Sequence, residues 1–226
     1  MTVSKRPDGF KINRFLSRPL TAVLLKTPLK PNHITALSLT FGILSGFLFS
    51  TGKYHFAALG ALAFQIAAVL DNCDGEIARA KGLKSVFGGW FDVTGDVLTD
   101  VALFTGLAFG LLKTGMKGPV CVAWILCASG SLINFFIVVL EKIKGFGPAV
   151  FDQPHPEGVQ RNSIFYDIGD ALREGDSSVF VVLFTLLNRT QILLWAGAVY
   201  IQIVWLSAVL LNFKWIFGSA ERNENR

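Results

Sequence analysis

The stretch DNCDGEIARAKGLKSVFGGWFDVTGD, from Asp71 to Asp96, decides the fold and carries the chemistry. It places four aspartates beside strongly apolar sequence, where an ionised carboxylate is costly unless a partner neutralises it. Asp71 and Asp74 are three residues apart, and Asp92 and Asp96 are four apart, so each pair shares one face of a helix. Because a short turn over 81–85 makes the two helices antiparallel neighbours, we expect the four carboxylates to converge.

The composition indicates a protein that crosses a membrane several times. Hydrophobic residues make up 52% and charged residues 16% of the chain, and the mean hydropathy is +0.50. Apolar stretches occur near 34–50, 55–70, 97–112, 119–140, 178–187 and 191–213. A span needs roughly 20 residues, so the second and third stretches suffice only if their helices continue through the aspartate run. We therefore expect an all-α integral membrane protein with six transmembrane helices and an N-terminal interfacial amphipathic helix.

Three regions follow along the chain. Residues 1–30 alternate basic and apolar residues at helical spacing, which favours an interfacial segment with its apolar face at the acyl boundary. A disordered basic tail is the alternative for this segment. Residues 31–216 form the six-helix domain, and 217–226 form a polar C-terminal tail.

The distribution of basic residues predicts the orientation in the membrane. Most of the 21 lysines and arginines fall on the side of the N-terminus, whereas Lys53, Lys113, Lys117 and Arg189 fall on the other side. The N-terminus and the aspartates should therefore face the cytoplasm, in the plasma or inner membrane. Because the basic residues flank spans and form no single stripe, nucleic-acid binding is not expected.

The aspartate run has the ligand chemistry of a divalent metal site. All-oxygen ligation suits Mg²⁺ or Mn²⁺, and two such ions could clamp the oxygens of a phosphoryl group during displacement. Gly75 and Ala78 remove side chains from the face of Asp74, and Arg79 offers a planar fork for phosphate. Taken singly, the small residues are better explained by close helix packing, and Arg79 by topology. The joint pattern favours a site.

The run is similar to the signature of the CDP-alcohol phosphotransferase family, Asp-x2-Asp-Gly-x2-Ala-Arg-x8-Gly-x3-Asp-x3-Asp. The eight fixed positions are Asp71, Asp74, Gly75, Ala78, Arg79, Gly88, Asp92 and Asp96. The sequence PNHIT, over 31–35, resembles the family's pattern before its first span. The resemblance implies a homodimer that moves a substituted phosphoryl group from a CDP-linked donor to an alcohol and releases CMP.

The same resemblance implies roles for individual residues. Asp71, Asp74 and Asp92 would be metal ligands, and Asp96 a ligand and the general base. The CDP site would comprise Asp74, Gly75, Ala78, Arg79, Ser85 and Gly88, bordered by Asn32 and Thr35. The position of Asp96 in the sequence agrees with its implied role as base. It lies deepest of the four aspartates along its helix, where a hydroxyl could approach.

The substrates are less determined than the chemistry. The membrane setting favours CDP-diacylglycerol as donor, with a soluble donor such as CDP-inositol as the alternative. Asp100, Lys142, Lys144, Arg161 and Arg173 are candidate acceptor-binding residues, which would favour inositol phosphate or glycerol phosphate. The basic residues among them also serve topology, and Asp100 could instead form an interhelical hydrogen bond. Val97 stands where the family resemblance leads us to expect arginine or lysine, which affects the acceptor more than the chemistry.

Two other expectations complete the prediction. We expect the homodimer to form through small-residue faces. Gly42 with Gly46, and Gly106 with Gly110, are candidate close-packing pairs, but such pairs are common in membrane helices and identify no interface alone. A divalent-metal carrier and a non-catalytic scaffold are the alternatives from other functional classes. Carriers bind ions near the midplane, whereas these aspartates cluster at one end.

Overall fold

The structure is a computed structural model that describes residues 12–116, 118–143 and 177–217. Within these residues the chain is helical and contains no strand. The helices are α1 (Ile12–Leu24), α2 (Pro31–Phe49), α3 (Tyr54–Ala80), α4 (Val86–Lys113), α5 (Pro119–Ile143), α7 (Ser177–Leu186) and α8 (Thr190–Phe217). The all-helical prediction is confirmed.

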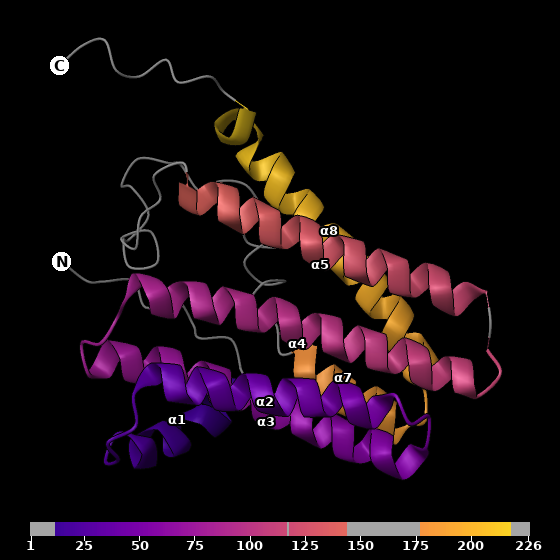
Figure 1. The fold of residues 1–226 in the computed structure, drawn as a ribbon, viewed down its shortest axis with the longest axis horizontal. Helices are drawn as coiled ribbons and strands as arrows, with labels where there is room; N and C mark the ends of the chain where they lie inside the picture. The colour runs from indigo at the N-terminus through magenta and orange to yellow at the C-terminus, as the bar shows by residue number, and fades with distance from the viewer. Residues whose placement is uncertain (1–11, 117, 144–176, 218–226) are drawn as a thin grey trace.

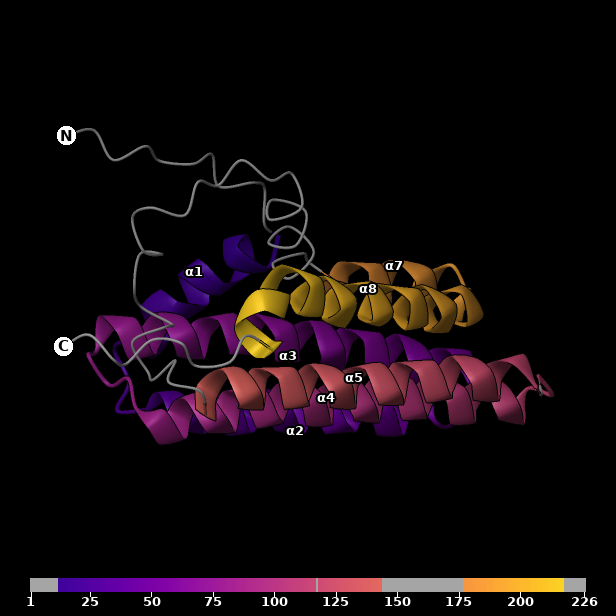
Figure 2. The same cartoon turned by 90° about the horizontal axis from the view of Figure 1, so that it is seen from above.

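Four long helices form a bundle, with α2, α3, α4 and α5 running side by side along the long axis of the molecule (Figure 1). Within the described residues, these are the helices long and apolar enough to cross a membrane. In Figure 2, α7 and α8 lie together along one side, and α8 also contacts α4 and α5. A buried core of alanine, leucine and phenylalanine side chains, including Phe64, Phe104 and Leu194, joins these helices.

The prediction of six spans is not confirmed. α7 has 10 residues in the described part of the chain, which at about 1.5 Å per residue is shorter than a hydrocarbon layer of about 30 Å. α8 has 28 residues and continues to Phe217, and Thr190–Leu206 within it is an apolar segment. The fifth and sixth spans therefore stay predictions.

Both helices of the aspartate run continue out of their apolar stretches, as the span lengths require. α3 extends to Ala80 and α4 starts at Val86, so the predicted turn between them is confirmed. Ser85 caps α4, because its hydroxyl accepts a hydrogen bond from the Gly88 amide at 3.0 Å.

The predicted glycine pairs are close-packing positions within one chain. A methyl group at Gly106 would fall on the carbonyl oxygen of Gly46, and one at Gly110 would fall on that of Phe49. Gly42 likewise lies against Thr99 of α4. These glycines let the backbones of α2 and α4 approach each other within one chain, so the predicted close packing is confirmed, and the homodimer stays a prediction.

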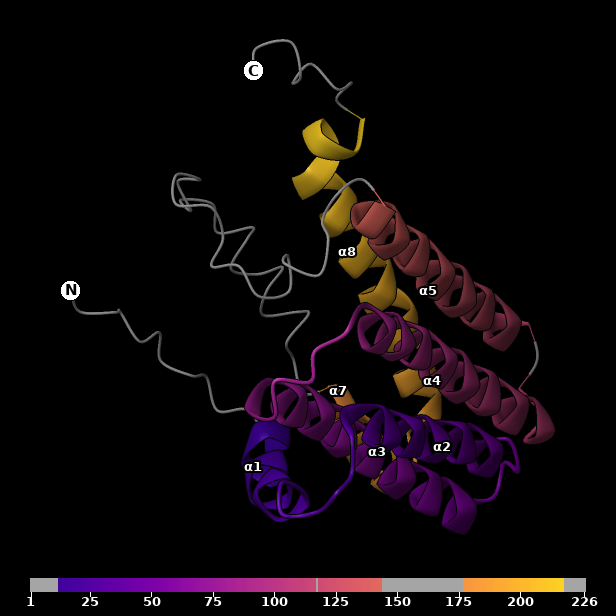
Figure 3. The same cartoon turned by 60° about the vertical axis from the view of Figure 1, so that its left-hand side comes forward.

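Helix α1 lies across the end of α3 (Figure 3). Its buried residues are Asn13, Ser17 and Thr21, spaced by one helical turn. Phe15 and Val23 are 70% and 61% exposed. Leu20 and Leu24 also pack against the buried cluster around Ile77, so the protein-facing side combines uncharged polar and apolar residues. The interfacial amphipathic helix over residues 1–30 stays a prediction. Residues 1–11 and 218–226 lie outside the described part of the chain, and the proposed domain boundaries stay predictions.

Candidate active site

Three of the four predicted ligands converge between α3 and α4. Asp71 and Asp74 project from the last turns of α3, and Asp92 from the second turn of α4. One carboxylate oxygen from each lies within 4.8 Å of the other two. Asp74 is 6% exposed. Three like charges so close together repel unless a cation lies between them, and an all-oxygen donor set suits a hard divalent ion. The donor set therefore fits the predicted metal.

Asp96 lies one turn beyond Asp92 on α4. Among the described residues it stands outside the three-carboxylate group, and its side chain is exposed. It is nevertheless within electrostatic range of Asp71 and Asp92. Asp96 is thus accessible beside the cluster, the position that the predicted general base would need. Its roles as base and as fourth ligand both stay predictions.

Thr35 fixes the position of the Asp74 carboxylate. Its hydroxyl donates a hydrogen bond to Asp74 Oδ2 at 2.5 Å, and both residues are buried. A methyl group at Gly95 of α4 would lie 4.0 Å from the Thr35 methyl group. Thr35 therefore stands between α3 and α4 and holds the carboxylate of a predicted metal ligand through Oδ2, a contact additional to the predicted one with the nucleotide.

Other residues predicted for the CDP site gather at the start of α4. A methyl group at Gly88 would lie 3.0 Å from the Ser85 hydroxyl and 3.1 Å from Asn32 Oδ1. The side chains of Asn32 and Ser85 thus flank the bare Gly88 backbone. Because a side chain at Gly88 would intrude between them, this position is suited to close approach by a bound group.

Arg79 folds back along its own helix toward the cluster. Its Nη1 atom would lie 3.4 Å from a methyl group at Gly75, one turn earlier, and its charge acts on Asp74. The side chain of Arg79 is exposed and that of Ala78 half-buried. An exposed guanidinium beside three carboxylates can bind the phosphate of a metal-associated ligand.

The predicted acceptor residues are only partly described. Asp100 is half-buried on α4, one turn from Asp96 and within electrostatic range of Cys127 on α5. Lys142 lies in the last turn of α5. Lys144, Arg161 and Arg173 lie outside the described residues.

The sequence reasoning missed two polar residues on α5. The Ser131 hydroxyl and Asn134 Oδ1 are buried without a hydrogen-bond partner among the described residues. They lie four and seven residues after Cys127, so they share the helix face that approaches Asp100. The sequence offered one signal for these residues: they are polar positions inside the apolar stretch 119–140. Buried polar groups require hydrogen-bond partners, so such positions indicate a polar contact.

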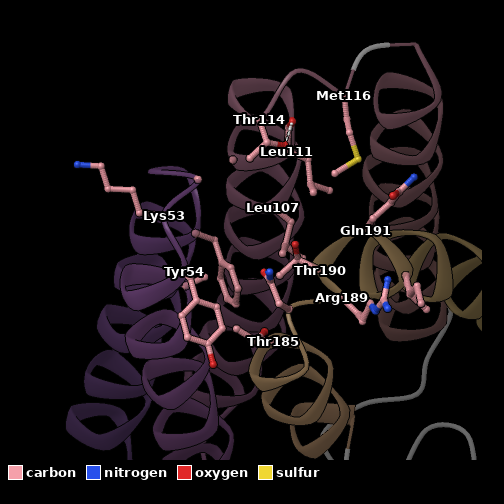
Figure 4. A pocket seen from close by; sticks show the side chains of 16 residues that line it. Lys53, Tyr54, Leu107, Leu111, Thr114, Met116, Thr185, Arg189, Thr190 and Gln191 are labelled. Carbon is pink, nitrogen blue, oxygen red and sulfur yellow. Dashed lines mark hydrogen bonds between the residues drawn. The ribbon is translucent and has the colours of Figure 1, made fainter.

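A cavity of about 360 Å³ lies at the opposite end of the bundle (Figure 4). The turns between α2 and α3, between α4 and α5, and between α7 and α8 surround it. Its lining includes Tyr54, Leu107, Thr114, Met116 and Arg189 and none of the predicted site residues. It is therefore separate from the aspartate cluster.

Comparison with known proteins assigns the family. The sequence pattern of the family described as CDP-alcohol phosphatidyltransferase matches residues 29–150, which include every position of the signature. The chain belongs to this family. The resemblance inferred from the aspartate run is thereby confirmed.

Several members of the CDP-alcohol phosphatidyltransferase family are similar over part of the chain. A bifunctional IPC transferase and DIPP synthase of Rubrobacter xylanophilus is 40% identical over 145 residues, covering 64% of this chain and 32% of that protein. A phosphatidylinositol phosphate synthase of Mycobacteroides abscessus is 29% identical over 135 residues, covering 58% of each. The chain thus spans about a third of the bifunctional relative and just over half of the synthase.

Solved structures show the same fold. The apo structure of Mycobacterium tuberculosis phosphatidylinositol phosphate synthase aligns with a TM-score of 0.58 and 25% identity, covering 86% of this chain and 95% of that one. A structure of that synthase with CDP-DAG bound aligns with a TM-score of 0.60 over 93% of this chain. The second alignment has 23% identity and supports the fold alone.

Proposed function

We propose that this protein is a metal-dependent transferase that moves a phosphatidyl group from CDP-diacylglycerol to a polar alcohol and releases CMP. The observation that carries the proposal is the convergence of Asp71, Asp74 and Asp92 within 4.8 Å in a member of this family. Thr35 orients this cluster and Arg79 flanks it, which supports a site organised for phosphate chemistry.

The chain's own residues can be assigned to each part of the transfer. Asp71, Asp74 and Asp92 would hold Mg²⁺ or Mn²⁺, which supplies charge neutralisation at the pyrophosphate. Arg79, Asn32 and Ser85 would bind the CDP part of the donor beside the bare backbones of Gly75 and Gly88.

Asp96 would take the proton of the acceptor hydroxyl. The acceptor oxygen then forms a bond to the phosphorus that carries the diacylglycerol, and the bond from that phosphorus to the bridging oxygen breaks. The electron pair leaves with CMP. The exposed position of Asp96 beside the cluster supports this role.

Inositol phosphate is the acceptor that the relatives favour, with glycerol phosphate as the other phosphorylated candidate. Two relatives named phosphatidylinositol phosphate synthase, from Mycobacteroides abscessus and Streptomyces avermitilis, match this chain. Asp100, Ser131 and Asn134 offer polar groups at the level of Asp96, where a polyol would enter. The bifunctional relative is named for a second activity, so a soluble donor such as CDP-inositol is the second candidate.

The proposal includes a membrane arrangement. The site would face the cytoplasm, the protein would have six spans, and two chains would form a homodimer. The excess of basic residues on the side of the aspartates supports the orientation.

The experiment is CMP release by the purified protein with Mg²⁺ or Mn²⁺. CDP-diacylglycerol and CDP-inositol are compared as donors, and inositol phosphate, glycerol phosphate, inositol and serine as acceptors. We expect release that depends on CDP-diacylglycerol and a phosphorylated acceptor.

Asp96→Asn provides the matched blank, because it removes the base while conserving shape. We expect this variant to lose turnover and keep CDP-donor binding. Acceptor-dependent release by Asp96→Asn at the wild-type rate would contradict the role of Asp96. Absence of CMP release by the wild-type protein with every pair of substrates would favour the metal carrier or the scaffold.

A further inference from the structure

A fifth carboxylate in the aspartate run points away from the metal cluster. Glu76 lies between Asp74 and Arg79 in sequence, but at about 100° per residue it is rotated about 140° from Asp71 and about 160° from Asp74. It therefore cannot serve as a ligand with them. Its two oxygens are held by α1: Ser17 donates to Oε1 at 3.1 Å and Thr21 donates to Oε2 at 2.6 Å.

The contact between α1 and α3 combines apolar and polar residues. Leu20 and Leu24 of α1 pack against the buried cluster that includes Ile77 of α3, and hydrogen bonds lie beside this packing. Asn13 Oδ1 accepts from Gln65 Nε2 at 2.6 Å, and Asn13 Nδ2 donates to Ser178 of α7 at 2.9 Å. The Cys73 thiol also approaches the Ser17 carbonyl oxygen at 3.6 Å. Directional hydrogen bonds fix the register of two helices more strictly than an apolar contact does.

A second tether follows Glu76 by about one and a half turns. The Lys81 ammonium donates to the carbonyl oxygens of Thr27 and Leu29, each at 2.9 Å. These carbonyls belong to the connection between α1 and α2. The end of α3 that carries the aspartates is thus held by α1 and by the segment that follows it.

The ligand-bearing part of α3 is consequently clamped from two sides. Thr35 of α2 holds Asp74 on the cluster side, and Ser17 with Thr21 hold Glu76 on the far side. A helix end that is held on one side only can rotate and tilt, and its carboxylates then no longer point to the same metal position. Holding both sides fixes the direction in which Asp71 and Asp74 present their oxygens.

We propose that Glu76 is a positioning residue, which docks α1 onto α3 and thereby sets the geometry and the metal affinity of the aspartate cluster. This inference rests on the proposed metal site. It gives α1 a function beyond membrane contact: the exposed apolar face with Phe15 and Val23 remains available to lipid while the polar face braces the site.

The test measures Mn²⁺ binding by electron paramagnetic resonance on the purified protein, independent of turnover. Glu76→Ala should lower Mn²⁺ affinity about 10-fold. This is the lower end of the loss in metal affinity seen when a residue that supports the metal ligands is removed. Thr21→Val, which conserves shape, should lower it less. Glu76→Gln should retain most of the Mn²⁺ affinity, because its amide can still form hydrogen bonds with the hydroxyls of Ser17 and Thr21.

A double-mutant cycle identifies the route of the effect. If Glu76 acts through α1, combining Glu76→Ala with Ser17→Ala and Thr21→Val should be no worse than Glu76→Ala alone. The same variants should expose Arg14 and Arg18 of α1 to faster tryptic cleavage. Thr114→Val is the matched control, because its hydroxyl bonds the Leu111 carbonyl at the other end of the bundle.

Unchanged Mn²⁺ affinity in both Glu76→Ala and Thr21→Val, with faster cleavage of α1, would overturn the positioning role. Strictly additive losses would also overturn it, because the effect would then not pass through α1. Absence of CMP release with normal Mn²⁺ binding would refute the proposed reaction and leave this inference standing.

Discussion

At the scale of single residues, the hydroxyl of Thr35 holds the Asp74 carboxylate in one position. We expect Thr35→Val to lower Mn²⁺ affinity about 10-fold, because the Asp74 carboxylate loses its buried donor while the packing volume is conserved. Thr40→Val is the matched control on the same helix, since Thr40 is exposed and bonds the carbonyl of Ala36. Isothermal titration of both variants checks the prediction, and equal affinities would contradict it.

The sequence predicted the convergence of the candidate ligands better than the contacts that hold them. Asp71 and Asp74 follow from local spacing, because helix geometry alone puts them on one face. The partners of Asp74 and Glu76 could not be predicted, because Thr35 and Thr21 lie 39 and 55 residues away and meet them only through helix packing. For Glu76 the sequence did hold one signal. At helical spacing its side chain points away from Asp71 and Asp74, which indicates a role outside the metal cluster.

At the scale of helices, the close contact between α2 and α4 requires glycines, because a side chain would not fit between the two backbones. Gly106→Ala places a methyl group on the Gly46 carbonyl oxygen, so the two helices must separate. We expect a loss of about 1–3 kcal/mol, typical of overpacking, seen as a lower midpoint of thermal unfolding in detergent. Gly95→Ala is the control on the same helix, because its methyl group would meet its nearest neighbour at 4.0 Å. Equal midpoints for the two variants would refute this account of the packing.

At the scale of helices, the sequence predicted what helix length decides and left open which helices pack together. The helices had to continue through the aspartate run to reach the length of a membrane span, and α3 and α4 do so. The glycine spacing in α2 correctly indicated a close approach, but periodicity does not say which helix approaches. The partner of these glycines is α4 of the same chain.

At the scale of the whole molecule, the site depends on three segments that are distant in sequence. α2 supplies Thr35, α3 and α4 supply the carboxylates, and α1 packs on α3 through Glu76, which points away from the cluster. The cavity lined by Arg189 lies beyond the other ends of these helices. The molecule therefore has two chemically different ends, and which end faces the cytoplasm determines where its substrates must come from.

The three native cysteines allow this orientation to be tested. Cys121 is exposed near the start of α5, whereas Cys73 and Cys127 are each 0% exposed. If the aspartates face the cytoplasm, a membrane-impermeant maleimide should label Cys121 from outside in intact spheroplasts of an expression host. Cys121→Ser should abolish this labelling. Lys84→Cys, added to Cys121→Ser in the turn beside the aspartates, should react only after the membrane is opened. The reverse pattern, with Lys84→Cys labelled in intact spheroplasts and Cys121 protected, would place the aspartates outside and exclude a cytoplasmic source of the CDP-linked donor.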